Sequence, residues 1–386
     1  MIYLDNAATT RPYDEVIEEI KKAQELFFAN PSSMHAAGYE AEKKISDAKS
    51  VLFSAIGADE KGKYGELLFT SGGTESNNLA FFGLLQNSLK RKPHIITTKI
   101  EHPSVLEPVK FLESLGAEVT FVSPDENGFI SPDSVLDAVQ DNTKIVSVML
   151  VNNETGAIAP ISEISKKVKA KNKDILIHTD CVQAFGNTKI DVVKMGIDML
   201  SLSAHKIHGP KGVGGLFVAK GVNLKPFLLG GHQQSNLRSG TLNTSGILGF
   251  SKAAEIMKKT FDEKQNLLLS LKERLIDNLK GNELFSINNE GDGYSPHILS
   301  LRVKNVRAEV LLHALEVHGI CISAGSACSS NRPAPSHVLE AMGYSKKHIE
   351  ETVRISTGAF NTLDDIDTFC EILKKEAQAL SKFTRI

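Results

Sequence analysis

Residues 203–212 read SAHKIHGPKG and place two lysines, two histidines and two glycines directly after the apolar run DMLSLS. A short apolar run of this kind predicts a buried strand, so Lys206 would stand at the end of that strand. A buried ammonium group is costly unless it is paired or neutralised. Lys206 therefore either reaches water or performs chemistry, and the chemistry typical of such a lysine is an imine with a carbonyl compound.

A second polar stretch of sequence follows a strand that we predict at residues 65–70. The sequence TSGGTES (70–76) indicates a strand end, a small flexible turn and the start of a helix. This geometry directs free backbone N–H groups and the positive helix end at an anion such as phosphate. The simpler interpretation is a capped helix with Thr74 or Ser71 as its N-cap residue. The stretch is no P-loop, because no Gly-Lys-Ser/Thr follows.

Three more predicted strands end in polar sequences, namely EHP (101–103), NNETG (152–156) and HTDCVQ (178–183). Taken singly, each has an ordinary explanation, since Asn and Asp are common turn residues and a lone histidine is usually a satisfied surface or core group. In open α/β sheets, however, ligands bind beyond the carboxyl ends of the strands. The five strand ends are therefore best interpreted together.

A phosphorylated cationic ring bound as an imine explains all five ends. Lys206 would hold the ring, and Asp180 would keep its pyridinium nitrogen protonated so that the ring can withdraw electrons. His102 would stack on the ring face, and the phosphate would lie at the helix start. The predicted cofactor is pyridoxal 5'-phosphate (PLP).

The segments that position these ends alternate between strands and helices from about residue 64 to residue 220. Such alternation predicts right-handed crossovers and a largely parallel sheet. After Thr241 a long helical stretch, broken near residues 260–265, precedes a mixture of strands and helices. We expect an α/β fold with a mostly parallel seven-stranded sheet flanked by helices in a large domain (13–255). A smaller α+β domain would comprise residues 1–12 and 256–386.

Composition excludes several classes of protein. The chain has 386 residues and a formal net charge of −2, so it lacks the basic bias of a protein that binds nucleic acid directly. Its start lacks the features of a signal peptide, and its apolar runs are too short to span a bilayer. The four cysteines match no zinc or disulfide pattern. We therefore expect no metal site, no membrane contact and a reducing, cytoplasmic setting.

One cysteine stands apart from the other three. Cys328 lies within residues 323–336, a run of small and turn-forming residues that predicts a flexible loop. A thiolate exposed there could act as a nucleophile. Cys181, Cys321 and Cys370 are expected to be small buried hydrophobic residues.

Sequence motifs along nearly the whole chain resemble those of the cysteine desulfurases, in the class V branch of the fold-type I PLP enzymes. They are, in order, YLDNAATT (3–10), NPSS (30–33), FTSGGTESNN (69–78), EHPSVL (101–106), VNNETG (151–156), HTDCVQ (178–183), SAHKIHGPKGVGG (203–215), RSGT (238–241) and GSACSS (325–330). The resemblance implies conversion of L-cysteine to L-alanine, with transfer of the sulfur to Cys328 as a persulfide. It also implies a homodimer and a sulfur-acceptor protein, such as an iron–sulfur scaffold or a tRNA-thiolation enzyme.

The resemblance further implies a role for each matching residue. Lys206 would anchor PLP and move protons, His102 would stack and act as acid or base, and Cys328 would be the nucleophile. The cofactor would also contact Gly73, Thr74, Asn153, Asp180, Gln183, Ser203, His205 and, across the dimer, Thr241. Asn153 would lie near the substrate, and Arg354 would bind the substrate carboxylate as a fork. Considered without the resemblance, Arg354 is as compatible with a structural ion pair.

The sequence departs from the family at residues 232–236, where HQQSN stands in place of the usual glycine, Gln or His, Glu, Arg and glycine. Two other functions stay open. The first is another class V PLP enzyme, such as an aminotransferase, a selenocysteine lyase or a cysteine-conjugate lyase; an aminotransferase would need no reactive cysteine in a loop. The second is a non-enzymatic scaffold of sulfur assembly, which would be expected to lack Lys206, Asp180 or Cys328, and this chain has all three.

Overall fold

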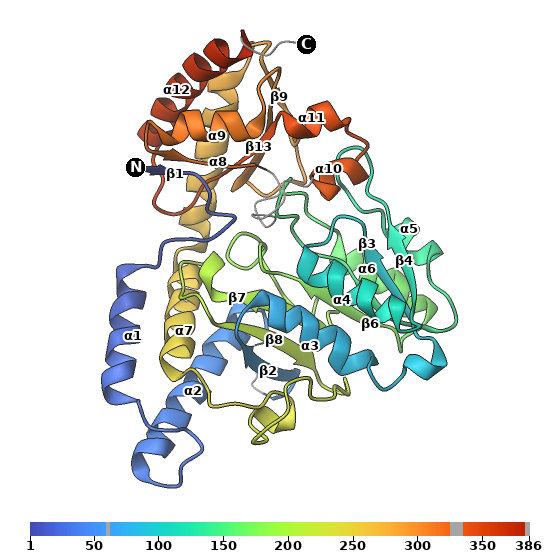
Figure 1. Ribbon diagram of the computed structural model, residues 1–386. Coiled ribbons are helices and arrows are strands. Elements are labelled where there is room, and N and C mark those ends of the chain that lie inside the picture. Colours follow the sequence, from blue (N-terminus) through green and yellow to red (C-terminus); the bar gives the residue numbers. More distant parts are fainter. Residues whose placement is uncertain (59–61, 325–334, 383–386) are drawn as a thin grey trace.

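The computed structural model describes residues 1–58, 62–324 and 335–382, so Cys328 lies outside the described residues. A seven-stranded sheet occupies the lower half of the molecule in Figure 1, and a smaller sheet with its own helices lies above it. The seven strands are β2 (Gly65–Thr70), β3 (His94–Thr98), β4 (Glu118–Val122), β5 (Thr143–Ser147), β6 (Leu176–Asp180), β7 (Met199–Ser203) and β8 (Gly214–Ala219).

The strand order in this sheet is β2-β8-β7-β6-β5-β3-β4. The pairs among β7, β6, β5, β3 and β4 are parallel, whereas β8 runs antiparallel to both β7 and β2. The predicted α/β fold with a mostly parallel seven-stranded sheet is therefore confirmed. Since six strands point the same way, their carboxyl ends meet at one edge, as the site requires.

Neighbouring residues of the central strands face two different cores. In β3, for example, Ile95 belongs to one hydrophobic cluster and Ile96 to another, and Met199 and Leu200 of β7 divide in the same way. This alternation follows from the two-residue period of a strand and explains why both residue positions are apolar. Helices α3 (Gly73–Leu85) and α4 (Pro103–Ser114) complete one cluster. Helices α2 (Ala36–Ala55), α6 (Ile161–Lys171) and α7 (Thr244–Lys259) contribute to the other.

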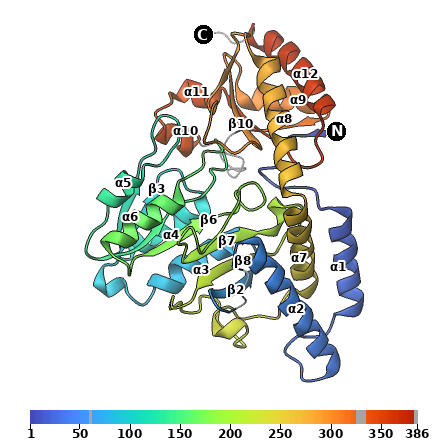
Figure 2. The same ribbon diagram turned by 180° about the vertical axis from the view of Figure 1, so that it is seen from behind.

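The remaining helices surround these layers or cover the second sheet. They are α1 (Asp14–Leu26), α5 (Pro132–Asp137), α8 (Phe261–Leu279), α9 (Ala308–Glu316), α10 (His337–Ala341), α11 (Lys346–Glu350) and α12 (Leu363–Ser381), with 3₁₀ turns at Leu89–Arg91, Ala204–Lys206 and Gln234–Asn236. The expected helix break falls at Thr260, between α7 and α8. Figure 2 shows α8 continuing upward from α7 to lie beside α12. No helix in the described parts of the chain is long and apolar enough to cross a membrane.

The second sheet is antiparallel and has the order β12-β13-β10-β9. Its strands are β9 (Phe285–Ile287), β10 (Ile298–Val303), β12 (Ser323–Ala324) and β13 (Thr352–Ser356), and β1 (Ile2–Tyr3) pairs in parallel with β11 (Ile320–Cys321) nearby. Leu4 at the chain start packs in the same hydrophobic cluster as residues of α8, α9 and α12. Val338 and Met342 of the α10 region instead pack in the cluster of the central sheet.

Candidate active site

A cavity of about 430 Å³ lies at the carboxyl ends of β2 and β7. Its lining residues come from three segments that are far apart in the sequence: Ala8, Thr9, Ser71, Gly72, Gly73, Thr74, Glu75, Ser203, His205, Lys211 and Gly212. Four of the predicted phosphate-binding residues, Gly73, Thr74, Ser203 and His205, are thus brought together. Lys211 and the segment at Ala8 were not predicted.

The start of α3 has the properties of an anion cradle. Its N-cap residue is Gly72, with a φ of 154° and no side-chain cap, so the alternative of a cap by Thr74 or Ser71 is wrong. Without such a cap, the first N–H groups of α3 are left for a ligand. The hydroxyl Oγ of Ser203 is buried at the same cavity and makes no hydrogen bond to any described residue. A bound oxyanion would satisfy both sets of donors.

His205 contributes a neutral ring to this cavity. Burial, together with the nearby Lys206 and Lys211 charges, lowers the pKa of His205 to about 4. Its Nδ1 lies 3.1 Å from Oγ1 of Thr9. The ring therefore offers hydrogen bonds to a ligand without adding a charge at neutral pH.

Lys206 stands on the 3₁₀ turn that follows β7, where the apolar strand ends. Its Nζ donates to the backbone oxygen of Ala8 at 2.8 Å and also to that of Ala7. The side chain is partly buried. The N-terminal segment therefore holds the amine beside Ala8, which lines the cavity.

Asp180 ends β6 and is almost fully buried at 4% exposure. Its Oδ1 accepts from the N–H of Val182 at 2.9 Å, and its Oδ2 accepts from Nδ2 of Asn77 at 2.7 Å. Asn77 also donates to Oγ of Ser104 at 2.8 Å. These bonds fix the orientation of the carboxylate, which can then accept a hydrogen bond from a protonated ring nitrogen.

The same network continues to His102. Oγ of Ser104 lies 2.7 Å from Nδ1 of His102, and the N–H of Ser104 donates to that nitrogen at 3.1 Å. Since Nδ1 accepts, the proton of the neutral ring resides on Nε2. Burial lowers the pKa of His102, and Lys206 acts in the same direction, while Asp180 opposes them.

The other predicted ligand-binding side chains lie where β13 and the N-terminal segment meet. Arg354 of β13 donates from Nη2 to Oδ1 of Asp5 at 2.9 Å and from Nη1 to the backbone oxygen of Asn153 at 2.8 Å. The structural ion pair that the sequence left open is therefore present. Nε of Arg354 is buried and makes no hydrogen bond within the described residues. The amide of Gln183 donates to the backbone oxygen of Ala7 at 2.7 Å.

Comparison with known proteins decides the family. Residues 2–369 match the family described as Aminotransferase class-V. This chain belongs to the class V aminotransferase family. Its relative from Dictyoglomus turgidum, cysteine desulfurase IscS, is 39% identical over 381 residues, covering 98% of this chain and 95% of the relative.

Solved structures agree with this membership of the class V family. A NifS-like protein superimposes with a TM-score of 0.92 at 35% identity, covering 98% of this chain and 100% of the other. SspA in complex with cysteine has a TM-score of 0.79 at 35% identity, covering 94% of this chain and 100% of SspA. The fold is that of the fold-type I PLP enzymes, and the cofactor of this family is PLP.

The residues of this class V chain fit PLP. The uncapped helix start and the buried Ser203 hydroxyl suit a phosphate, and the acceptor oxygens of Asp180 suit a protonated pyridine nitrogen. The amine of Lys206 donates to the backbone oxygen of Ala8, which lines the same cavity as the helix start. Bound there, PLP would supply an electron-withdrawing ring.

The remaining predicted residues are Thr241 and the cysteines. Thr241 is exposed on the surface, and Cys328 belongs to the residues outside the described part. Of the other cysteines, Cys181 and Cys370 are buried as expected, and burial raises the pKa of Cys370 to about 11. Cys321 is partly exposed, so the expectation that it is buried is wrong. It lies on the short strand β11, which pairs only with β1 among the described strands.

The N-terminal segment is the main feature without a predicted role. Asp5 binds Arg354, Ala7 accepts from Lys206 and Gln183, and Thr9 contacts His205. Two of these four contacts use the backbone oxygen of Ala7, for which side-chain types give no signal. The motif YLDNAATT was noticed in the sequence. Its two alanines allow the side chains of Lys206 and Gln183 to reach the backbone oxygens of this segment, and that contact is seen only once the fold is known.

Proposed function

We propose that this protein is a PLP-dependent cysteine desulfurase that converts L-cysteine to L-alanine and transfers the sulfur to Cys328 as a persulfide. The observation that carries the proposal is the convergence of Lys206, Asp180, His102 and the α3 cradle at one edge of the sheet. Cysteine desulfurase names among relatives that match almost the whole chain support the choice of substrate. The structure of SspA with cysteine supports it further.

The cofactor-binding roles proposed here are those that the family resemblance gives to the matching residues. Gly73, Thr74, Ser203 and His205 would bind the phosphate, Asp180 the pyridinium nitrogen, and Lys206 the aldehyde carbon. Asn153 and Gln183 would contact the phenolic oxygen of the ring. In support, the side chains of Gln183 and Lys206 donate to the same backbone oxygen, that of Ala7. PLP bound in this way would weaken the bonds around the α-carbon of an attached amino acid.

The chain's own groups would perform the remaining work. Arg354 would hold the substrate carboxylate through its guanidinium, whose Nε is buried without a partner among the described residues. The amine of Lys206 would take and return the α-proton, and Nε2–H of His102 would supply a proton at the ring face. The Cys328 thiolate would attack the substrate sulfur, so that an S–S bond forms as the C–S bond breaks. The carbon skeleton then takes up protons and leaves as alanine.

We propose further features beyond the reaction itself. The exposed Thr241 would contact the phosphate bound by a second copy of the chain, which makes the active form a homodimer. The persulfide would pass to an acceptor protein in the cytoplasm, such as an iron–sulfur scaffold or a tRNA-thiolation enzyme. Residues 13–255 would form the large domain, and residues 1–12 and 256–386 the small one. Separate hydrophobic clusters in the two parts support this division, although the α10 region packs with the first.

Alanine production from L-cysteine with added reductant tests the proposal. We expect activity in the wild type and its loss in Lys206→Ala and Cys328→Ala. Cys321→Ala is the matched control, because this cysteine is partly exposed but has no proposed role, and it should keep full activity. Full activity of Cys328→Ala would refute the persulfide step and favour another class V reaction.

A further inference from the structure

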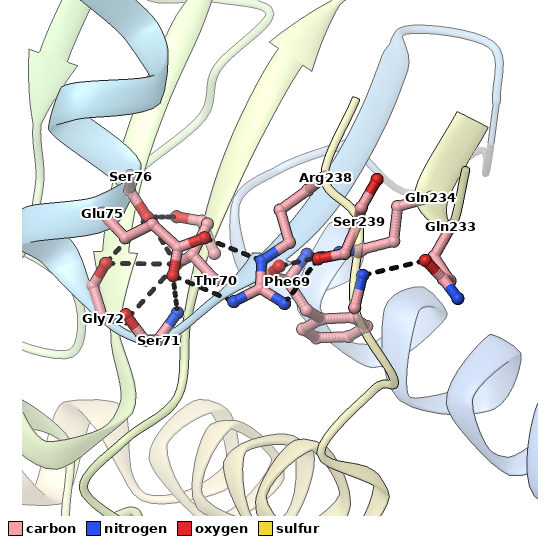
Figure 3. A network of polar contacts seen from close by, with 12 residues as sticks. Phe69, Thr70, Ser71, Gly72, Glu75, Ser76, Gln233, Gln234, Arg238 and Ser239 are labelled. Atoms are coloured by element: carbon pink, nitrogen blue, oxygen red, sulfur yellow. Dashed lines mark hydrogen bonds and ion pairs between the residues drawn. The ribbon is translucent and has the colours of Figure 1, made fainter. Parts of the chain in front are cut away.

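Residues 232–241, which we call the bracing segment, run beside the outermost strand β2 just before the α3 cradle (Figure 3). The side-chain amide of Gln234 donates to the backbone oxygen of Phe69 at 2.8 Å and accepts from its N–H at 2.6 Å. The Gln234 amide therefore gives Phe69 of β2 the hydrogen-bond donor and acceptor that a neighbouring strand would provide. Oγ of Ser235 donates to Glu66 of the same strand at 2.7 Å. The bracing segment is therefore fixed to the strand that leads into the cavity.

The backbone of the bracing segment depends on these contacts. His232, Gln234, Ser235 and Asn236 have φ values of 63°, 48°, 57° and 64°. Left-handed backbone is unfavourable for residues with a Cβ atom, and a run of such residues persists only where surrounding contacts hold it. These four positions lie in the stretch where the sequence departs from the family pattern.

Arg238 connects the bracing segment to the cradle itself. Its Nε donates to Oε1 of Glu75 at 2.7 Å, and its Nη2 donates to Oε2 at 3.1 Å. Both side chains are 18% exposed. Oε2 of Glu75 also accepts from the N–H of Ser71 at 2.7 Å. One carboxylate thus joins Arg238 to the turn that precedes α3, as Figure 3 shows.

The charge of Glu75 lies beside the proposed phosphate site and is paired with Arg238. Its side chain lines the same cavity as Gly73 and Thr74. Burial by itself would raise the pKa of Glu75, but the hydrogen bonds from Arg238 and Ser71 outweigh it, and the pKa is lowered. A charged carboxylate at this place would repel a phosphate dianion if it were not neutralised. The fork of Arg238 matches both carboxylate oxygens and so neutralises it.

We propose that Arg238 is a positioning residue for the phosphate of PLP, acting through Glu75. It neutralises the only carboxylate that lines the described part of the cavity and holds the Ser71 turn in the conformation that presents the start of α3. The inference rests on the cofactor assigned under the proposed function. It explains why an acidic residue is tolerated at the cradle.

A double-mutant cycle on PLP affinity tests this role. PLP is removed from the purified holoenzyme, and its dissociation constant is measured by titration of absorbance for wild type, Arg238→Ala, Glu75→Gln and the double variant. We expect Arg238→Ala to weaken PLP binding by about tenfold, because an unneutralised charge remains. The double variant should return to within about threefold of wild type, since Glu75→Gln removes the charge but keeps a side-chain oxygen that can accept from Ser71. Competition by inorganic phosphate should follow the same order.

Two comparisons separate this role from a loss of folding. Arg274→Ala removes a forked pair of similar geometry, with Asp367 at 2.7 Å and 2.8 Å, in the small sheet's helix layer, and should leave PLP affinity unchanged. A merely structural role predicts that the double variant binds as weakly as Arg238→Ala, and that result would overturn the inference. Wild-type affinity in Arg238→Ala would do the same. If the wild type itself bound no PLP, the proposed function would fail instead.

Discussion

Glu101 should make the stability of this protein fall as pH rises. Its side chain is fully buried beside His102 at the end of β3. Oε1 accepts from Oγ1 of Thr98 at 2.7 Å and from the N–H of Met149 at 2.9 Å, while Oε2 makes no hydrogen bond to the described residues. Burial raises the pKa of Glu101 from its ordinary value of 4.5 to about 8. The folded protein therefore keeps a proton here that the unfolded chain has lost.

The sign and size of the effect follow from this difference. Between pH 4.5 and about 8 the folded state binds one proton more than the unfolded state at this position, so stability is fully present below pH 4.5 and is lost as pH rises toward 8. Each pH unit in this interval is worth about 1.4 kcal/mol, and the whole interval about 5 kcal/mol. Glu101→Gln removes the titrating group but keeps an amide oxygen for Thr98 and Met149.

Urea denaturation at matched PLP content, from about pH 5 to about pH 8, measures this effect. The free energies of unfolding of wild type and Glu101→Gln should be similar at the lower pH. At the upper pH the variant should be more stable by roughly 4 kcal/mol. Glu107→Gln is the control, since the side chain of Glu107 is 69% exposed, and it should follow the wild type. Parallel curves for Glu101→Gln and wild type would show that Glu101 is ionised in the folded protein and refute the reasoning.

Three further predictions concern the polar contacts around the site. Asp5→Ala should raise KM for L-cysteine about tenfold by releasing Arg354, whereas Asp5→Asn, which can still accept from the guanidinium, should raise it less; steady-state kinetics distinguish them, and equal values would contradict a positioning role. Asn77→Ala should lower the free energy of unfolding by about 2 kcal/mol, because the buried Asp180 loses a charge-assisted hydrogen bond, and should also weaken PLP binding in a titration. Gln234→Ala should lower the midpoint of urea denaturation by an amount equivalent to about 1–2 kcal/mol, and no change would mean that water replaces its pairing with the strand.

The sequence predicted the central sheet well because its strands are buried on both faces. The strand predicted at residues 65–70 is β2, with the same bounds, and its last four residues are buried. Helix α2, at Ala36–Ala55, had no predicted counterpart. Half of its buried residues are small, namely Gly38, Ala41 and Ala48, and small residues weaken the apolar periodicity.

The site was predicted from side chains, and what was missed depends on backbone and long-range geometry. Asn77 lay within a noticed motif, but its contact with Asp180 spans 103 positions in the sequence and requires the α3 face to meet β6. Arg354 was recognised as a carboxylate ligand, yet its partner Asp5 lies 349 positions away. Residues 232–236 of the bracing segment were recognised only as a departure from the family, because the contact with β2 uses the side-chain amide of Gln234 in place of a strand.

The most direct test of the central claim is the fate of the substrate sulfur. Purified holoenzyme is mixed with L-cysteine without reductant, and the peptides are then analysed by mass spectrometry together with the alanine released. The account predicts alanine formation with the mass of at least one added sulfur atom on the peptide that contains Cys328, and neither product in Lys206→Ala. Alanine formation with an unmodified Cys328, or with the added sulfur on Cys321 instead, would contradict it.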